Sequence, residues 1–193
     1  MTNGLRERHK QMSQTKQRAR IVVGPGRLSF PFLLEPQATE NGDKYSVTLL
    51  LPPGYDTKPL LAALNDCARE AWGPDKAKWP KKARMPEDVI RDASEKSLSG
   101  YDEGWKFISA SSKAKPGIVD ANKDEVHDPD AVYAGRWGRI NVTPYTYAAK
   151  GNVGISFGLN SVQILKNDTP FGGRGNAKND FDAWAEDMED APF

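Results

Sequence analysis

Cysteine and histidine are scarce in this chain. Among its 193 residues there is one cysteine, Cys67, and there are two histidines, His9 and His127. A single cysteine excludes an internal disulfide framework and a multi-cysteine zinc site, so we interpret Cys67 as a small buried apolar side chain. The two histidines lie far apart in the sequence and form no recognisable triad or zinc motif. We therefore expect neither a metal nor another cofactor.

Long apolar runs are also missing. No stretch approaches the ~20 residues that a membrane helix needs, and the first residues lack the apolar core of a signal peptide. We therefore expect a soluble, intracellular protein with no membrane partner. The length fits one domain of ordinary size with tails.

Catalytic and ligand-binding motifs are incomplete. The segment that starts at Asp120 begins like a calcium loop, but Glu125 stands where that loop requires glycine. The sequence Gly172-Gly-Arg-Gly lacks the Gly-Lys-Ser/Thr ending of a phosphate-binding loop. We expect a protein that is not an enzyme. The rival hypothesis is a metal-dependent nuclease or recombination enzyme that uses Asp120, Asp124 and Asp128.

Charge is distributed unevenly, although the net charge is only +1. Residues 1–20 contain six basic side chains and one acid, whereas residues 180–193 contain six acids and no base. Such asymmetry is typical of polyanion binding combined with an interaction tail. We therefore divide the chain into a basic flexible arm (1–20), a folded domain (21–171) and an acidic flexible tail (172–193).

The first half of the folded domain predicts two strands and a helix. After a predicted turn at Gly24-Pro-Gly, an alternating strand begins whose predicted buried face is Leu28, Phe30, Phe32 and Leu34. Residues 44–51 alternate in the same way. Apolar residues then recur at helical spacing from 60 to about 72, with Pro59 tolerated in the first turn. Residues 73–100 predict a long, partly helical insertion that exposes a basic patch around Trp79.

The second half predicts strands with an unusual outer face. Residues 105–111 form one strand, and residues 133–165 form two more around an Ala-Ala-Lys-Gly-Asn turn. Ile140 and Val142 would point to the core, while the odd-numbered residues from Tyr133 to Tyr147 would share the opposite face. Four or five strands, one dominant helix and no βαβ rhythm predict a mainly β fold, a small antiparallel barrel of the OB type.

That outer face mixes aromatic rings with basic groups, a combination that a core disfavours. Single-stranded nucleic acid requires this combination, because bases stack on aromatic rings at ~1–3 kcal/mol each while cations contact the phosphates. Stacking is tolerant of sequence, so we expect binding without sequence preference. A preference for RNA over DNA stays open as an alternative. The predicted DNA-binding residues are Trp105, Phe107, Lys113, Lys115, Tyr133, Arg136, Trp137, Arg139, Tyr145, Tyr147 and Arg174, together with Trp79, Lys81 and Lys82 of the insertion.

The acidic tail ends in Pro192 and Phe193. A terminal carboxylate beside an aromatic ring, preceded by acids, can dock in a small apolar pocket with a basic rim on a partner. The same acids can compete with nucleic acid for basic groups of this protein. We predict that Asp187, Glu189, Asp190, Pro192 and Phe193 bind a partner protein.

Several short motifs together resemble a known family. They include Gly26-Arg-Leu-Ser-Phe-Pro-Phe, Lys115-Pro-Gly-Ile-Val-Asp, Val132-Tyr-Ala-Gly-Arg-Trp and Phe171-Gly-Gly-Arg. They resemble single-stranded-DNA-binding proteins of tailed bacteriophages over roughly residues 24–181. The resemblance implies an OB fold, sequence-independent DNA binding and a role in phage DNA replication or recombination in the cytoplasm of an infected bacterium.

The end of the chain carries a second resemblance. The sequence Asp187-Met-Glu-Asp-Ala-Pro-Phe is similar to the acidic tip of bacterial single-stranded-DNA-binding proteins, which recruits replication and repair enzymes. The likeness implies that replication or recombination proteins are partners of the tail, besides single-stranded DNA itself and, more weakly, duplex DNA or RNA. The basic arm and the segment around Trp79 have no counterpart in the resemblance.

Overall fold

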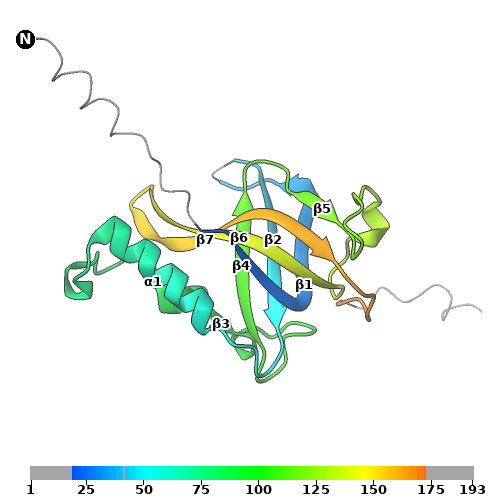
Figure 1. Ribbon diagram of the computed structural model, residues 1–193, viewed down its shortest axis with the longest axis horizontal. Coiled ribbons are helices and arrows are strands. Elements are labelled where there is room, and N and C mark those ends of the chain that lie inside the picture. The colour runs from blue at the N-terminus through cyan, green and yellow to red at the C-terminus, as the bar shows by residue number, and fades with distance from the viewer. Residues whose placement is uncertain (1–18, 41, 173–193) are drawn as a thin grey trace, which may run out of the picture.

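The computed structural model describes residues 19–40 and 42–172. Its long strands form a single barrel, and the α-helix lies beside this barrel (Figure 1). The strands and the helix are β1 (Ile21–Gln37), β2 (Lys44–Leu51), α1 (Lys58–Trp72), β3 (Arg91–Asp92), β4 (Lys106–Ser112), β5 (Gly117–Val119), β6 (Trp137–Ala149) and β7 (Asn152–Ile164). Short 3₁₀ turns are η1 (Lys76–Lys78), η2 (Pro86–Val89), η3 (Ala93–Glu95) and η4 (Pro129–Ala131).

Five strands form a closed ring. Hydrogen-bonded neighbours follow the order β4, β2, β1, β6, β7, all antiparallel. A parallel pairing of Ala110 and Ser111 on β4 with Phe157 and Gly158 on β7 closes the ring. The short strands β3 and β5 extend β4 and β7 outside it. The predicted mainly β barrel with one main helix is confirmed.

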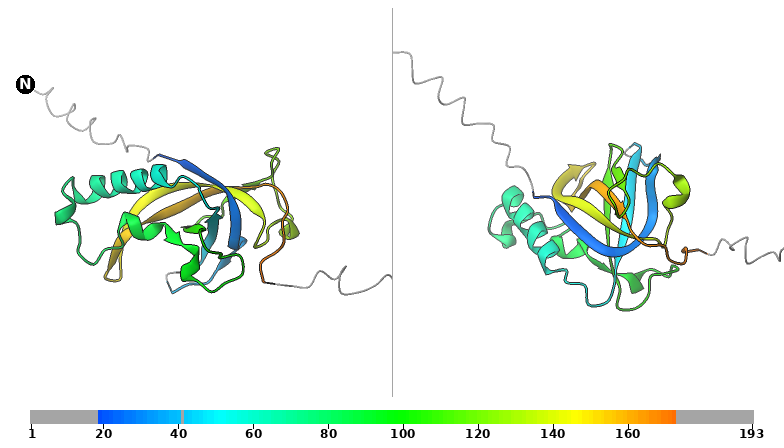
Figure 2. Two further views of the ribbon diagram at one scale, coloured as in Figure 1. Left: turned by 90° about the horizontal axis from the view of Figure 1, so that it is seen from below. Right: turned by 45° about the vertical axis from the view of Figure 1, so that its right-hand side comes forward.

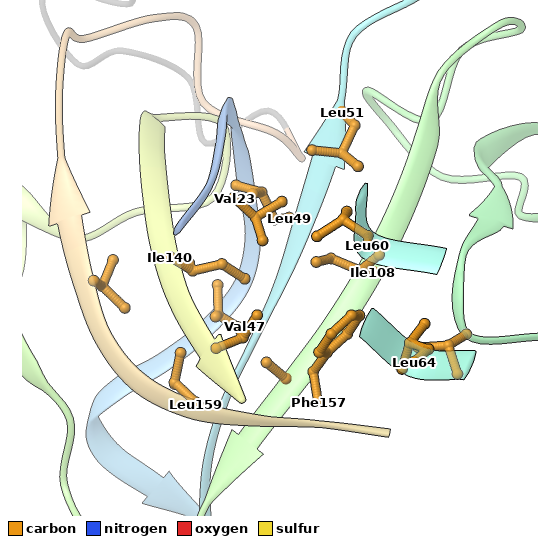
Figure 3. Close-up of a cluster of buried hydrophobic side chains, with 14 of the residues drawn as sticks. Val23, Val47, Leu49, Leu51, Leu60, Leu64, Ile108, Ile140, Phe157 and Leu159 are labelled. Carbon is orange, nitrogen blue, oxygen red and sulfur yellow. The ribbon is translucent and has the colours of Figure 1, made fainter. Parts of the chain in front are cut away.

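The barrel interior is filled by aliphatic side chains from every long strand (Figure 3). On β6 the expected alternation is present, since Ile140 and Val142 are buried while Arg139 and Asn141 are partly exposed. Helix α1 packs beside the long β6–β7 hairpin (Figure 2) and adds Leu60 and Leu64 to this core. Burial of each such side chain stabilises the fold by roughly 1.5–3 kcal/mol.

Two expectations about β1 are wrong. The segment from Gly24 to Gly26 is a register shift within one long strand and not a turn that ends it. A second register shift follows Ser29, where Phe30 adopts a positive φ of 47°. This bulge turns the Phe30 ring outward, so that it is 46% exposed, whereas Leu33 takes the buried position.

No helix among residues 19–40 and 42–172 is long and apolar enough to cross a membrane.

Candidate nucleic-acid interface

A basic groove lies on the outer face of the barrel, where β4, β7 and β6 are neighbours. Its volume is about 700 Å³. Four cations line it, namely Lys44, Arg84, Lys113 and Lys150, and no carboxylate does. Two rings, Tyr145 and Tyr147, and the small polar residues Ser111, Asn152 and Ser156 complete most of the lining. We call this the β4–β6 groove.

The two tyrosines owe their position to strand alternation. Tyr145 and Tyr147 are two residues apart on β6, so both rings project from its outer face. Their centroids are 6.3 Å apart with the planes tilted by 52°. Within the described part of the chain, neither hydroxyl has a hydrogen-bond partner. Each ring therefore offers a partly exposed face that no internal polar contact fixes.

Because residue 154 of β7 is a glycine, the side chains of Tyr147 and Arg84 can both lie directly over it. Tyr147 is opposite Gly154 in the β6–β7 register. A Cβ atom at Gly154 would lie 2.7 Å from the Tyr147 hydroxyl oxygen and 2.7 Å from the Arg84 Cβ. Any larger residue would displace one of these side chains.

Backbone hydrogen bonds hold Arg84 beside the groove. Its N–H donates to the Val153 carbonyl at 3.0 Å, and its carbonyl accepts from the Ile155 N–H at 3.1 Å. The segment between α1 and β3 is thereby attached to the free edge of β7. Arg84 and Lys44 are groove residues that sequence reasoning missed, because only the folded pairing brings them to β6. Lys150, in the turn directly after β6, was also missed.

Arg84 also borders a second hollow of about 410 Å³, which contains Asp88, Arg91, Lys96, Phe107 and Ser109. The cationic groups of Arg91 and Lys96 each lie 5.2 Å from the centroid of the Phe107 ring. The two hollows lie along one side of β4. This second hollow contains Phe107 and Ser109, and the β4–β6 groove contains Ser111 and also Lys113, the residue that follows the strand. Together they form one basic path along this strand.

Two aromatic residues that were predicted to stack on bases, Phe107 and Trp79, are buried. The expectation that their rings are exposed for stacking is therefore wrong. Phe107 is 3% exposed because the loop before β4 folds back and packs Tyr101 against it at 5.6 Å between centroids. The Tyr101 hydroxyl donates to Ser29 Oγ, and burial raises the pKa of Tyr101, which keeps this hydroxyl protonated.

Trp79 is also 3% exposed. Its ring packs edge-on against Trp72 at 5.5 Å, and its indole N–H donates to the Gly73 carbonyl at 2.9 Å. Trp79 therefore anchors the insertion to the end of α1. Lys81 and Lys82 are exposed beside it, as predicted, but neither lines the β4–β6 groove.

The remaining predicted residues of β6 and its approach form a separate cluster. Trp105 and Trp137 pack at 6.3 Å between centroids, and the Trp137 indole N–H donates to Asp168 Oδ2 at 2.7 Å. This hydrogen bond is the main cause that lowers the pKa of Asp168. Arg27 stacks on Phe171 at 4.4 Å and lies 3.6 Å from the Asp168 carboxylate. We call these residues the Trp105–Trp137 cluster.

Polar groups around this cluster form hydrogen bonds within the protein. The Arg136 guanidinium donates to the carbonyls of Ala131 and Leu165. The Tyr133 hydroxyl contacts Asn167 and Asp168 at 3.1–3.2 Å. Arg136 and Tyr133 therefore fasten the residues after β7 to the barrel.

The other predicted residues are dispersed. Arg139 donates to the Gln163 side-chain oxygen on the outer face of β6 and β7. Lys115 is exposed near β5. Arg174 and the tail residues Asp187, Glu189, Asp190, Pro192 and Phe193 lie outside the described residues.

Two carboxylates of the rival nuclease hypothesis, those of Asp120 and Asp128, accept hydrogen bonds within their own loops. Asp120 Oδ1 accepts from the backbone N–H groups of Asn122 and Asp124. Asp128 Oδ1 accepts from the Asp130 N–H. Within the described ranges, no group of three His, Cys, Asp or Glu residues is arranged to bind a metal ion.

Comparison with known proteins places the chain in a family. A family model described as the single-stranded-DNA-binding protein of Enterobacter phage Enc34 matches residues 19–192. The chain belongs to this Enc34 family. The predicted resemblance to phage single-stranded-DNA-binding proteins is thereby confirmed.

Individual relatives agree with this assignment. Protein p50 of Acyrthosiphon pisum secondary endosymbiont phage 1 is 30% identical over 181 residues, which cover 88% of this chain and 97% of p50. The Enc34 protein, solved in complex with single-stranded DNA, matches with a TM-score of 0.64 and 27% identity, over 79% of this chain and 89% of the Enc34 chain.

A more distant structure shares the fold alone. The single-stranded-DNA-binding protein gp2.5 of bacteriophage T7 matches with a TM-score of 0.60 at 13% identity, over 86% of this chain and 96% of gp2.5. The predicted OB-type barrel is thereby confirmed.

Proposed function

We propose that this protein binds single-stranded DNA in the β4–β6 groove, without sequence preference and without catalysing a reaction on it. The observation that carries the proposal is the composition of the groove: four cations and two tyrosine rings without a carboxylate. Membership of the Enc34 family supports it, since the Enc34 protein was solved with single-stranded DNA.

The groove explains how a strand would be bound. Tyr145 and Tyr147 would stack on bases, and every base has a face that can stack. Lys44, Arg84, Lys113 and Lys150 would contact phosphates. Stacking does not distinguish one base from another, so the affinity would depend on the length of the strand and on salt.

The test is a binding titration with single-stranded DNA of two unrelated sequences, duplex DNA and RNA of matched length. We expect similar affinities for the two single strands and weaker binding of duplex. The logarithm of the affinity should fall with the logarithm of salt concentration by about 0.7 per phosphate neutralised.

A variant supplies the matched control. Lys113→Ala should reduce this salt slope by about 0.7, whereas Lys58→Ala on the exposed side of α1 should not change it. Strong preference for one sequence would contradict the proposal.

We further propose that the acidic tail recruits replication or recombination proteins in the cytoplasm of the infected bacterium and competes with DNA for the basic groove. The six acids of residues 180–193 support this competition. Deletion of residues 187–193 should preserve folding and tighten DNA binding, most at low salt. An unchanged affinity at low salt would refute the competition.

A further inference from the structure

The outer face of the β6–β7 ribbon continues beyond the groove as a polar strip. Cross-strand neighbours on this face are Tyr147 with Gly154, Tyr145 with Ser156, Thr143 with Gly158, Asn141 with Ser161, and Arg139 with Gln163. The groove contains Tyr147, Tyr145 and Ser156 of the first two pairs. A smaller hollow of about 260 Å³ contains the last two pairs, together with Val22 and Lys123. The β6–β7 ribbon runs across the barrel (Figures 1 and 2), and its outer face contributes residues to both hollows.

A bulge makes this strip continuous. Between Leu159 and Ser161 the β7 register shifts, which places Asn160 on the outer side as well. Its side-chain amide donates to Asn141 Oδ1 at 2.8 Å and to Thr143 Oγ1 at 2.9 Å. The even-numbered residues Ile140 and Val142 remain buried beneath. From Tyr147 to Arg139 the strip spans about 27 Å.

The distribution of charge along the strip suits the binding of a nucleic acid. None of its cross-strand residues is acidic, and Arg139 and Lys123 are cationic at its far end. Arg139 contacts Gln163 through Nε and one Nη, so its second Nη is available to a phosphate. The nearby Asp120 carboxylate accepts from two N–H groups of its own loop. Amide and hydroxyl groups of this kind contact phosphates and sugars.

The strip also leads to the start of the folded chain. Ile21 pairs with Val142, and Val22 pairs with Asn141. Arg20, which is exposed, therefore precedes β1 directly beside the strip. Residues 1–20, with six basic side chains, join the barrel at this point.

We propose that a single strand of DNA that fills the β4–β6 groove continues along the β6–β7 ribbon, past Thr143 and Asn141, to Arg139 and Lys123. The strip is a second subsite for the same strand. This inference rests on the proposed function of the groove, and it assigns to Arg139 and Lys123 a role that the groove alone does not give them.

Oligonucleotide length separates the two subsites. An oligothymidylate of about six nucleotides fills the groove alone, whereas one of about twenty also reaches the strip. The test compares both oligonucleotides with the full chain and with the Ser161→Asp and Lys123→Glu variants. We expect each change to weaken binding of the long oligonucleotide about 5-fold or more and to leave binding of the short one within about 2-fold.

The control is Lys58→Glu on α1, which makes the same charge change as Lys123→Glu at another exposed lysine. It should affect the long oligonucleotide by less than about 2-fold. Equal weakening of both oligonucleotides, or no effect on the long one, would overturn the second subsite. Failure of the unaltered protein to bind even the short oligonucleotide would instead refute the proposed function of the groove.

Discussion

The β4–β6 groove and the Trp105–Trp137 cluster contain the same kinds of side chain in different states. In the groove, the hydroxyls of Tyr145 and Tyr147 have no partner within the described residues, Arg84 and Lys150 each donate to one backbone carbonyl, and no carboxylate lines the hollow. In the cluster, the Trp137 N–H is bound to the Asp168 carboxylate, and the neighbouring Arg136 contacts two carbonyls. The comparison teaches that aromatic and basic residues form a candidate binding surface where the fold leaves the rings open and brings no carboxylate to the cations.

The largest effect that we expect from this difference is on stability at the cluster. Trp137→Ala removes the contact with Trp105 and leaves Asp168 without its strongest hydrogen bond. We expect the free energy of unfolding to fall by about 3 kcal/mol, measured by urea denaturation. Affinity of the folded protein for a short oligonucleotide should change little.

A conservative variant sharpens this prediction. Trp137→Phe retains a ring against Trp105 but loses the hydrogen bond to Asp168, so it should lose much less stability than Trp137→Ala. If Trp137→Ala left stability intact and abolished DNA binding, Trp137 would be a stacking platform and the two regions would not differ as described.

The next largest effect should be on DNA affinity at the groove. Tyr147→Ala removes one stacking ring, which should weaken single-stranded-DNA binding by about 1–3 kcal/mol, measured by fluorescence titration. The free energy of unfolding should change by less than about 1 kcal/mol, since the hydroxyl has no partner in the described residues.

Tyr147→Phe is the matched control. It retains the ring and removes only the hydroxyl, so it should bind DNA almost as well as the unaltered protein. Equal losses of affinity in both variants would show that the hydroxyl, and not stacking, determines binding at this position.

The contrast between groove and cluster also explains which residues of the fold and of the candidate site could be predicted from the sequence. Period-two alternation was sufficient to place Ile140 and Val142 inside and Tyr145 and Tyr147 outside, because a strand has only two faces. It failed at Phe107, whose ring is covered by Tyr101 from the loop before β4. It could not apply to Trp79, which lies outside the strands and packs against Trp72 at the end of α1. It also missed Arg84 and Lys44, because no local pattern predicts that the segment after Trp79 pairs with Val153 and Ile155. Long-range pairing thus decided which residues form the candidate site.

The smallest expected effect is a pH dependence at the cluster. The Trp137 hydrogen bond, helped by the Thr169 N–H and by Arg27, lowers the pKa of Asp168 from its ordinary value of 3.8. Because the folded state favours the carboxylate, the stabilisation that it provides is complete above pH 3.8 and is lost as the pH falls through the lowered pKa. In Asp168→Asn, the midpoint of urea unfolding should therefore decrease less between neutral pH and the acid range than in the unaltered protein. The matched control is Asp66→Asn on α1, whose carboxylate is exposed and pairs only with Arg69 within the helix. If Asp66→Asn and Asp168→Asn changed the acid sensitivity equally, Asp168 would be an ordinary surface carboxylate and would not fasten Trp137 in place.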